Sequence, residues 1–212
     1  MSDLTPEDIA PFFTRSDGSY VFARWGRAIA PVVFGVEEET LTIVKGAIEA
    51  CVAIAGHEVT GADAELGANL MVFFLSEWDE LLDVPHMDDM IPDLANRVAT
   101  LKERDAHQYR AFRFDDAGAI KACFSFVRMS EALQKVPADV IALSQAVQAM
   151  LLWSDTVFTQ DSPLAEAPEG TVVRPDVANL LRAAYDPVLP AAARDEAHAL
   201  RLYARLVAGD AS

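Results

Sequence analysis

The spacing of apolar residues predicts strands alternating with helices from residue 20 onward. Tyr20 to Trp25 and Ile29 to Phe34 are short apolar stretches interrupted or closed by glycine, which is typical of strands. Apolar side chains then recur every three or four positions from Glu37 to Ala55, which predicts a helix, and Gly56 is a natural stop for it. Ala68 to Leu75 is an apolar run of strand length, typical of a strand covered on both faces. This order of strand, helix and strand predicts a parallel pair joined by a crossover.

The middle of the chain predicts a hairpin followed by a buried helix. Tyr109 to Phe114 and Ile120 to Val127 are expected to be two strands, joined by a turn at Asp115 to Gly118. A helix is expected before them, from Ile91 to Arg104. Pro137 to Trp153 is apolar around most of a helical circumference, which indicates a helix buried against the sheet.

The last third of the chain predicts an irregular segment and then further helices. Ser154 to Gly170 has no clear periodicity, whereas Asp176 to Tyr185 and Arg194 to Val207 have helical spacing. The fold class that follows is α+β, with a mixed sheet packed against helices and a C-terminal helical segment. We expect a single domain of three parts: an N-terminal arm at 1–19, the sheet and core helices at 20–153, and the irregular segment with C-terminal helices at 154–212.

Composition excludes several partners. The 212 residues carry 33 acidic and 17 basic side chains, for a net charge of -16. Such a charge repels phosphate backbones and anionic lipids, so nucleic acid and membrane surfaces are not expected partners. The first residues lack the basic and apolar regions of a signal peptide, and no apolar run is long enough to span a bilayer, so the chain as written is expected to be cytoplasmic.

Charged residues cluster in the middle of the chain. The stretch from Ser76 to Asp93 is acidic and includes His86, but Pro85 and Pro92 break its periodicity, so we expect a solvated loop and helix rather than a metal site. A local excess of basic residues follows it. We expect these to pair with the acidic stretch, although they would also suit an acidic segment of a partner subunit. They are Arg97, Lys102, Arg104, Arg110 and Arg113.

The usual catalytic motifs are missing from the sequence. It contains no phosphate-binding glycine loop, no dinucleotide fingerprint and no G-x-S-x-G nucleophile elbow. Cys51 and Cys123 lie in apolar segments outside any C-x-x-C, so two buried free thiols are expected. The four histidines are scattered over different predicted elements. No metal or cofactor is therefore expected.

From about Tyr20 to Tyr203 the order of elements resembles a zincin-like fold, in particular a bacterial family of unknown function similar to metallopeptidases that have lost their metal. The resemblance is carried by Arg24 and Trp25 ahead of the strand at Ile29 to Phe34, and by Asn69 at the start of the strand at Ala68 to Leu75. Active zincins have H-E-x-x-H on the helix that corresponds to Pro137 to Trp153.

In that register the metal-binding and catalytic positions hold Ser144, Gln145 and Gln148, with Ser154 in the place of a third ligand. Hydroxyl and amide groups bind Zn²⁺ poorly, so the resemblance implies no metal. Two interpretations of these four residues remain open. They are hydrogen-bonded structural groups, or they line a remnant cleft that holds a peptide against an edge strand without cutting it.

Two functional hypotheses follow. The first is a non-catalytic pseudo-peptidase that acts as a binding or assembly module, with a protein or peptide ligand or a second copy of the chain as partner. The alternative is a hydrolase whose active site is assembled from dispersed groups such as His57, Asp155 and Asp161.

Overall fold

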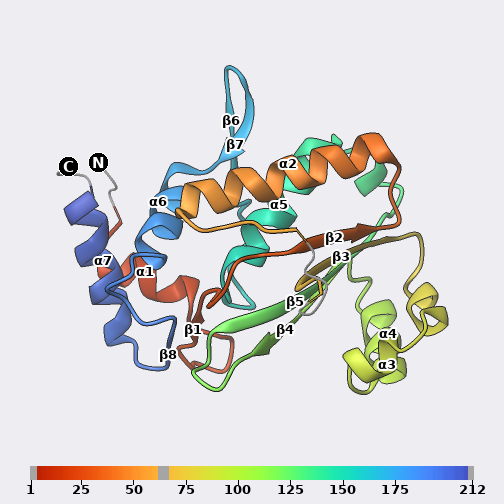
Figure 1. The fold of residues 1–212 in the computed structure, drawn as a ribbon, viewed down its shortest axis with the longest axis horizontal. Helices are drawn as coiled ribbons and strands as arrows, with labels where there is room; N and C mark the ends of the chain where they lie inside the picture. The colour runs from red at the N-terminus through yellow and green to blue at the C-terminus, as the bar shows by residue number, and fades with distance from the viewer. Residues whose placement is uncertain (1–3, 62–66, 210–212) are drawn as a thin grey trace.

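The computed structural model describes residues 4–61 and 67–209, and it has the predicted α+β class (Figure 1). Its centre is a four-stranded mixed sheet with the strand order β2-β3-β5-β4. Strands β2, β3 and β5 are parallel to one another, while β4 is antiparallel to β5 and forms one edge. The strand bounds are Pro31–Phe34 for β2, Leu70–Leu75 for β3, Gln108–Phe114 for β4 and Ile120–Arg128 for β5.

One face of the sheet is covered by α2, Glu38–Ala55, and α5, Ala138–Met150. Helix α2 ends where the sequence predicts, because Gly56 adopts a left-handed conformation with φ 64°. Helix α5 is mostly buried, as predicted, and it packs against α2 and β5. The parallel pairing of β2 with β3 around α2 and the β4–β5 hairpin are also confirmed.

The opposite face carries a second apolar core beneath η2, Trp78–Asp83, α3, Met87–Met90, and α4, Leu94–Glu103. The acidic side chains of this stretch are exposed, as expected of a solvated segment. Trp78 and Met87 are nevertheless buried against the sheet. The acidic stretch is therefore a covering layer with an apolar inner side, and the sheet is enclosed on both faces.

The segments outside the central sheet differ most from the predictions. The stretch from Ser154 to Gly170, expected to be irregular, contains β6, whose hairpin partner β7 follows and projects from the body (Figure 1). Tyr20 to Trp25 forms only a two-residue strand, β1, which pairs with β8, and it meets the central sheet through a single bridge between Trp25 and Ile120. The remaining bounds are Phe22–Ala23 for β1, Leu133–Lys135 for η3, Leu164–Ala167 for β6, Gly170–Val173 for β7, Pro175–Ala184 for α6, Ala192–Ala193 for β8 and Ala197–Gly209 for α7.

The N-terminal segment packs against the main core. Helix α1, Pro6–Ile9, begins at a Thr5 capping box, and η1, Ala10–Phe12, follows it directly. Phe13 is fully buried in the main core and stacks on Trp153 with 5.7 Å between ring centroids. Residues 1–3 of the expected arm lie outside the described residues.

Helix α5 ends three residues earlier than predicted, because Leu151 is extended and bridges Arg24, and the Leu152 N–H donates to the Ala23 carbonyl at 2.9 Å. The indole N–H groups of Trp25 and Trp153 donate to the carbonyl oxygens of Ala149 and Val147, at 2.9 and 3.0 Å. The Tyr185 hydroxyl donates to the Met150 carbonyl at 2.7 Å. Carbonyls at a helix end have no partner within the helix, so these donors satisfy groups that burial would otherwise leave unpaired.

Candidate functional site

The polar residues of α5 meet an arginine from the edge strand. Arg110 of β4 donates through Nη1 to Gln145 Oε1 at 2.8 Å and through Nη2 to Gln148 Oε1. A third, longer contact of 3.4 Å joins Nη1 to Gln108 Oε1. Because Arg110 pairs with Ser125 of β5 across the strands, it shares the face of the sheet that α5 covers.

The amide groups of this cluster are also bonded to one another. Gln145 Nε2 donates to Gln108 Oε1 at 2.9 Å, and Gln148 Nε2 donates to Ser144 Oγ at 3.0 Å. Gln145 Oε1 additionally accepts from Ser125 Oγ at 3.3 Å. Gln145 and Gln148 are 7% and 6% exposed, so these bonds satisfy groups that have little access to water. The prediction that the polar residues of this helix face something other than bulk water is confirmed.

The charge of Arg110 has no carboxylate partner among the described residues. The ion pairs of that part of the chain do not include it, and its polar contacts are with neutral amide oxygens. Burial lowers the pKa of its guanidinium to about 10, which leaves it protonated at neutral pH. A half-buried charge without an opposite charge beside it is unfavourable, so this centre attracts anions.

The outer edge of β4 is open beside this cluster. The Arg128 N–H donates to the His107 carbonyl, so the backbone groups of every second residue from 107 point to β5. Those of Gln108, Arg110 and Phe112 therefore point away from β5. No described strand pairs with that edge. The Phe112 carbonyl accepts from Arg113 Nη1 at 3.2 Å, and the other outward backbone groups of these residues can accept an added strand.

Two hollows flank the cluster. We call the smaller one, of about 320 Å³, the β4 pocket; it is lined by Arg15, Gln108, Tyr109, Arg110, Phe112, Gln148, Leu152, Trp153, Ser154, Asp155, Val157, Phe158 and Thr159. The larger one, of about 840 Å³, we call the α5 hollow; it contains Ser144, Gln145 and Gln148 along with residues 160–164. Gln108, Gln148, Phe158 and Thr159 line both hollows, so they form the wall between them.

Phe158 in this wall has an unusual backbone. Its φ of 55° lies in the left-handed region, which is unfavourable for a bulky residue. Edge-to-face contacts with Trp153, at 5.2 Å, and Phe12, at 6.3 Å, hold its ring in place. A strained backbone of this kind persists only where the surrounding packing enforces it, and here the aromatic contacts of Phe158 do so.

The structure does not bring Ser154 into the Arg110 cluster. Its hydroxyl donates to the Thr14 carbonyl at 2.6 Å, although the residue lines the β4 pocket together with Gln148. Of the four remnant-cleft residues expected from the sequence, Ser144, Gln145 and Gln148 form one hydrogen-bonded group and Ser154 stands apart from it.

The groups proposed for a dispersed hydrolase site occupy three different environments. Asp155 lines the β4 pocket and accepts from both the N–H and the hydroxyl of Ser16, which hold its pKa below the usual range. Asp161 lines the α5 hollow. His57 lines neither, because its ring contacts the Arg27 carbonyl and the Tyr185 ring; burial lowers its pKa.

No activated nucleophile or metal cluster is found near the pocket. Burial raises the pKa of the Cys123 thiol to about 12, although nearby Arg110 opposes the shift, and Cys51 is raised to about 12 by burial alone. Within residues 4–61 and 67–209, no three His, Cys, Asp or Glu side chains are grouped so that they could hold a metal ion.

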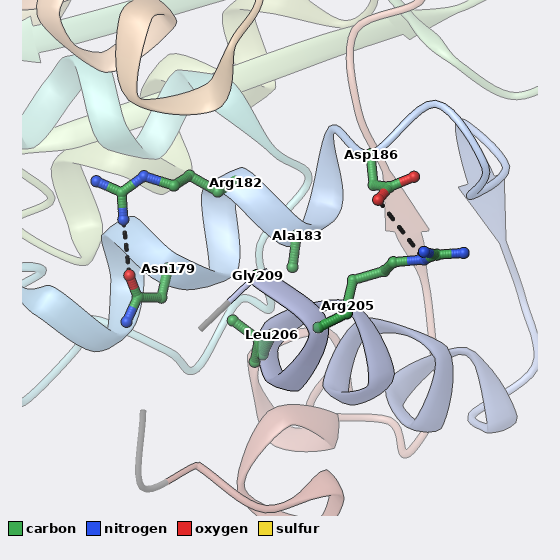
Figure 2. A pocket seen from close by; sticks show the side chains of 8 residues that line it. Asn179, Arg182, Ala183, Asp186, Arg205, Leu206 and Gly209 are labelled. Carbon is green, nitrogen blue, oxygen red and sulfur yellow. Dashed lines mark hydrogen bonds and ion pairs between the residues drawn. The ribbon is translucent and has the colours of Figure 1, made fainter. Parts of the chain in front are cut away.

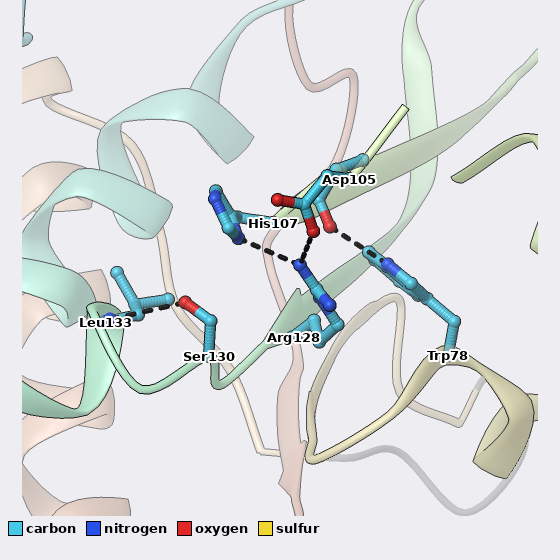
Figure 3. Close-up of polar contacts among 7 residues, drawn as sticks. Trp78, Asp105, His107, Arg128, Ser130 and Leu133 are labelled. Atoms are coloured by element: carbon cyan, nitrogen blue, oxygen red, sulfur yellow. Dashed lines mark hydrogen bonds and ion pairs between the residues drawn. The ribbon is translucent and has the colours of Figure 1, made fainter. Parts of the chain in front are cut away.

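A second arginine, Arg128, forms an ion pair with Asp105, which lines the α5 hollow together with His107 (Figure 3). Arg128 donates to Asp105 Oδ1 at 2.5 Å and contacts His107 Nδ1 at 3.3 Å. Arg128 therefore has a carboxylate partner, whereas the side-chain acceptors of Arg110 are amide oxygens alone.

Another hollow lies between α6 and α7 and is separate from this chemistry (Figure 2). Its charged side chains are already bonded: Arg205 pairs with Asp186 at 3.6 Å, and Arg182 donates to Asn179 at 2.7 Å. Each charged group among these four residues therefore already has a partner within the chain.

Sequence reasoning missed Arg110 as the centre of the site. Arg110 was grouped with basic residues expected to pair with the acidic stretch, but of these five only Lys102 forms an ion pair with it, to Asp79 at 2.6 Å. Arg113 instead donates to the Met90 carbonyl. The sequence does contain a signal for Arg110, because Gln108, Arg110 and Phe112 are two positions apart and so share one face of a strand.

Comparisons of the chain with protein-family models, with curated proteins and with solved structures give no match. In the described part of the chain, no helix combines the length and the apolar character needed to cross a membrane.

Proposed function

We propose that this protein is a non-catalytic peptide-binding module that takes a peptide as an added strand along β4. The observation that carries the proposal is the open edge of β4 beside α5, where Gln145 and Gln148 hold Arg110. In the zincin-like register, Ser144, Gln145 and Gln148 would stand at the H-E-x-x-H positions. Backbone hydrogen bonds at such an edge supply affinity, and pockets beside it supply specificity.

The polar cluster supports a binding role over a catalytic one. The two glutamines hold Arg110 between β4 and α5 and carry no ionisable group, so they supply neither a metal ligand nor a general base. A peptidase that had lost its metal would keep the edge strand and the groove. We therefore expect a bound peptide to be released uncut.

A proline substitution on β4 tests the proposal. Phe112→Pro removes a backbone N–H that points to the open edge, and it leaves the hydrogen bonds to β5 in place. The matched control is Phe112→Ala, which also shortens the side chain but keeps the N–H. The probe is a mixture of N-acetylated hexapeptides, with bound members identified by mass spectrometry.

We expect Phe112→Ala to keep binding members of the mixture through the β4 edge, and Phe112→Pro, which lacks the same ring, to lose them while its far-UV circular dichroism stays unchanged. Equal retention by all three proteins would show that the β4 edge is not used. Recovery of cleaved peptides would favour the hydrolase alternative instead.

A further inference from the structure

The β4 pocket gathers positive charge in an acidic protein. The chain has a net charge of -16, yet this pocket is lined by two arginines, Arg15 and Arg110, and by a single acidic residue, Asp155. Asp155 is already hydrogen-bonded to Ser16 through both carboxylate oxygens. The local balance thus favours an anion in a molecule whose overall field repels anions.

Arg110 has unused capacity for such an anion. A guanidinium has five N–H groups, and the three contacts with Gln108, Gln145 and Gln148 leave two of them. The present acceptors are neutral amide oxygens, which bind a guanidinium less strongly than a carboxylate does. An incoming carboxylate would therefore add a charge-assisted bond without displacing the amides.

The rest of the pocket restricts which anion fits. Overall repulsion disfavours multiply charged groups such as phosphates and acidic peptide segments, and it leaves a single carboxylate as the best tolerated anion. Leu152, Trp153 and Phe158 line the pocket and suit an apolar side chain. Phe158 and Thr159 close it toward the α5 hollow, so a peptide lying on β4 meets a wall there.

We propose that the β4 pocket binds the C-terminal residue of a peptide, with its α-carboxylate on Arg110 and Arg15 and its apolar side chain against Trp153 and Phe158. This proposal rests on the proposed function, because the same peptide pairs its backbone with the outward groups of β4. It adds that the ligand is a free chain end and not an internal segment.

The first test changes the ligand and leaves the protein intact. Two mixtures of N-acetylated tetrapeptides ending in Leu, Ile, Val or Phe are compared, one with a free α-carboxylate and one amidated. We expect the free acids to bind at least about tenfold more tightly, because amidation removes the charge-assisted bonds. Equal binding of both mixtures would overturn the carboxylate proposal and leave β4 pairing standing. Binding of neither would overturn the proposed function as well.

The second test changes the pocket. In Arg110→Met, amidation of the peptide should weaken binding much less than in wild type, since only Arg15 is left to pair with the carboxylate. In Gln148→Glu a carboxylate of the protein itself lies beside Arg110, and the preference for free acids should also be reduced. Arg104→Met makes the same charge change as Arg110→Met, but in the α5 hollow, and should keep the full preference. A full preference for free acids in both pocket variants would contradict the proposal.

The third test separates a peptide end from a free inorganic anion. Inorganic phosphate and acetate are titrated as competitors against a bound free-acid tetrapeptide at constant ionic strength. We expect weak competition by acetate and none by phosphate at equal concentration. Stronger competition by phosphate would show that the pocket reads phosphate, and would overturn the proposed ligand.

Discussion

His198 is a buried histidine whose ring nitrogens have no hydrogen-bond partner among the described residues. The Phe22 ring lies 4.3 Å from it between centroids and the Tyr20 ring 6.4 Å, and the Tyr20 hydroxyl is itself buried without a partner. Burial, helped by the charge of Arg201, lowers the pKa of His198 to about 4. The native fold therefore holds this ring in its neutral form.

Because His198 is buried in its neutral form, the free energy of unfolding should depend on pH. The pKa is 6.5 for an unperturbed ring and about 4 in the fold, so protons bind the unfolded chain more tightly. The free energy of unfolding should be unaffected by His198 above pH 6.5. It should fall between pH 6.5 and 4, by up to about 3 kcal/mol. The measurement is urea unfolding of wild type and His198→Leu over this range. The two curves should converge or cross as the pH falls, and parallel curves would contradict the assignment.

At the scale of elements, periodicity predicts the parts of the fold whose pattern is local. Helix α2 was predicted within one residue because its apolar stripe and Gly56 are both visible in the sequence. The hairpin of β6 and β7 was missed, since its strands have only four residues each and Pro168 and Glu169 are not a typical hairpin turn.

The candidate site was predicted only in part, because its contacts join segments that are far apart in the sequence. The burial of Gln145 and Gln148 follows from the apolar pattern of their helix, but their bonding to Arg110 depends on how α5 crosses the sheet. No spacing within either segment encodes that crossing. The early end of α5 was likewise invisible, because the groups that complete it come from Trp25 and Tyr185.

The end of α5 provides a prediction at this scale. Tyr185→Phe removes the hydroxyl that donates to the buried Met150 carbonyl, and should lower the free energy of unfolding by about 1–3 kcal/mol. The matched control is Tyr203→Phe, which removes the same atom from a partly buried tyrosine whose hydroxyl has no hydrogen bond within residues 4–61 and 67–209. Urea unfolding at pH 7 measures both variants. Equal midpoints would mean that the carbonyl finds another donor.

For the molecule as a whole, the N-terminal segment belongs to the main core. Phe13 is fully buried between Trp153, Tyr20 and Phe22, so it ties the first residues to the chain that follows α5. Side chains of residues 4–19 therefore contribute to the same core as the sheet and its helices. The apolar residues of α1 and η1 close one side of the molecule.

Removing the Phe13 ring should destabilise the whole fold. Phe13→Ala is expected to lower the free energy of unfolding by about 3–5 kcal/mol, because it leaves a cavity among aromatic rings. Phe34→Ala is the control, since Phe34 is 45% exposed and its loss should cost much less. Thermal melting of the two variants compares them. Similar melting temperatures would show that the N-terminal segment is detachable after all.

The two donors Trp25 and Tyr185, which bond to the last carbonyls of α5, are synthesised at different times. Trp25 leaves the ribosome early, whereas Tyr185 and the β8 partner of β1 are made near the end of the described chain. A nascent chain that stops before Tyr185 has an unpaired β1 and a helix end without its last donor. Such chains expose surface that chaperones recognise. The fold is therefore completed only when Tyr185 and β8 have been synthesised. We expect stalled or truncated chains to be degraded.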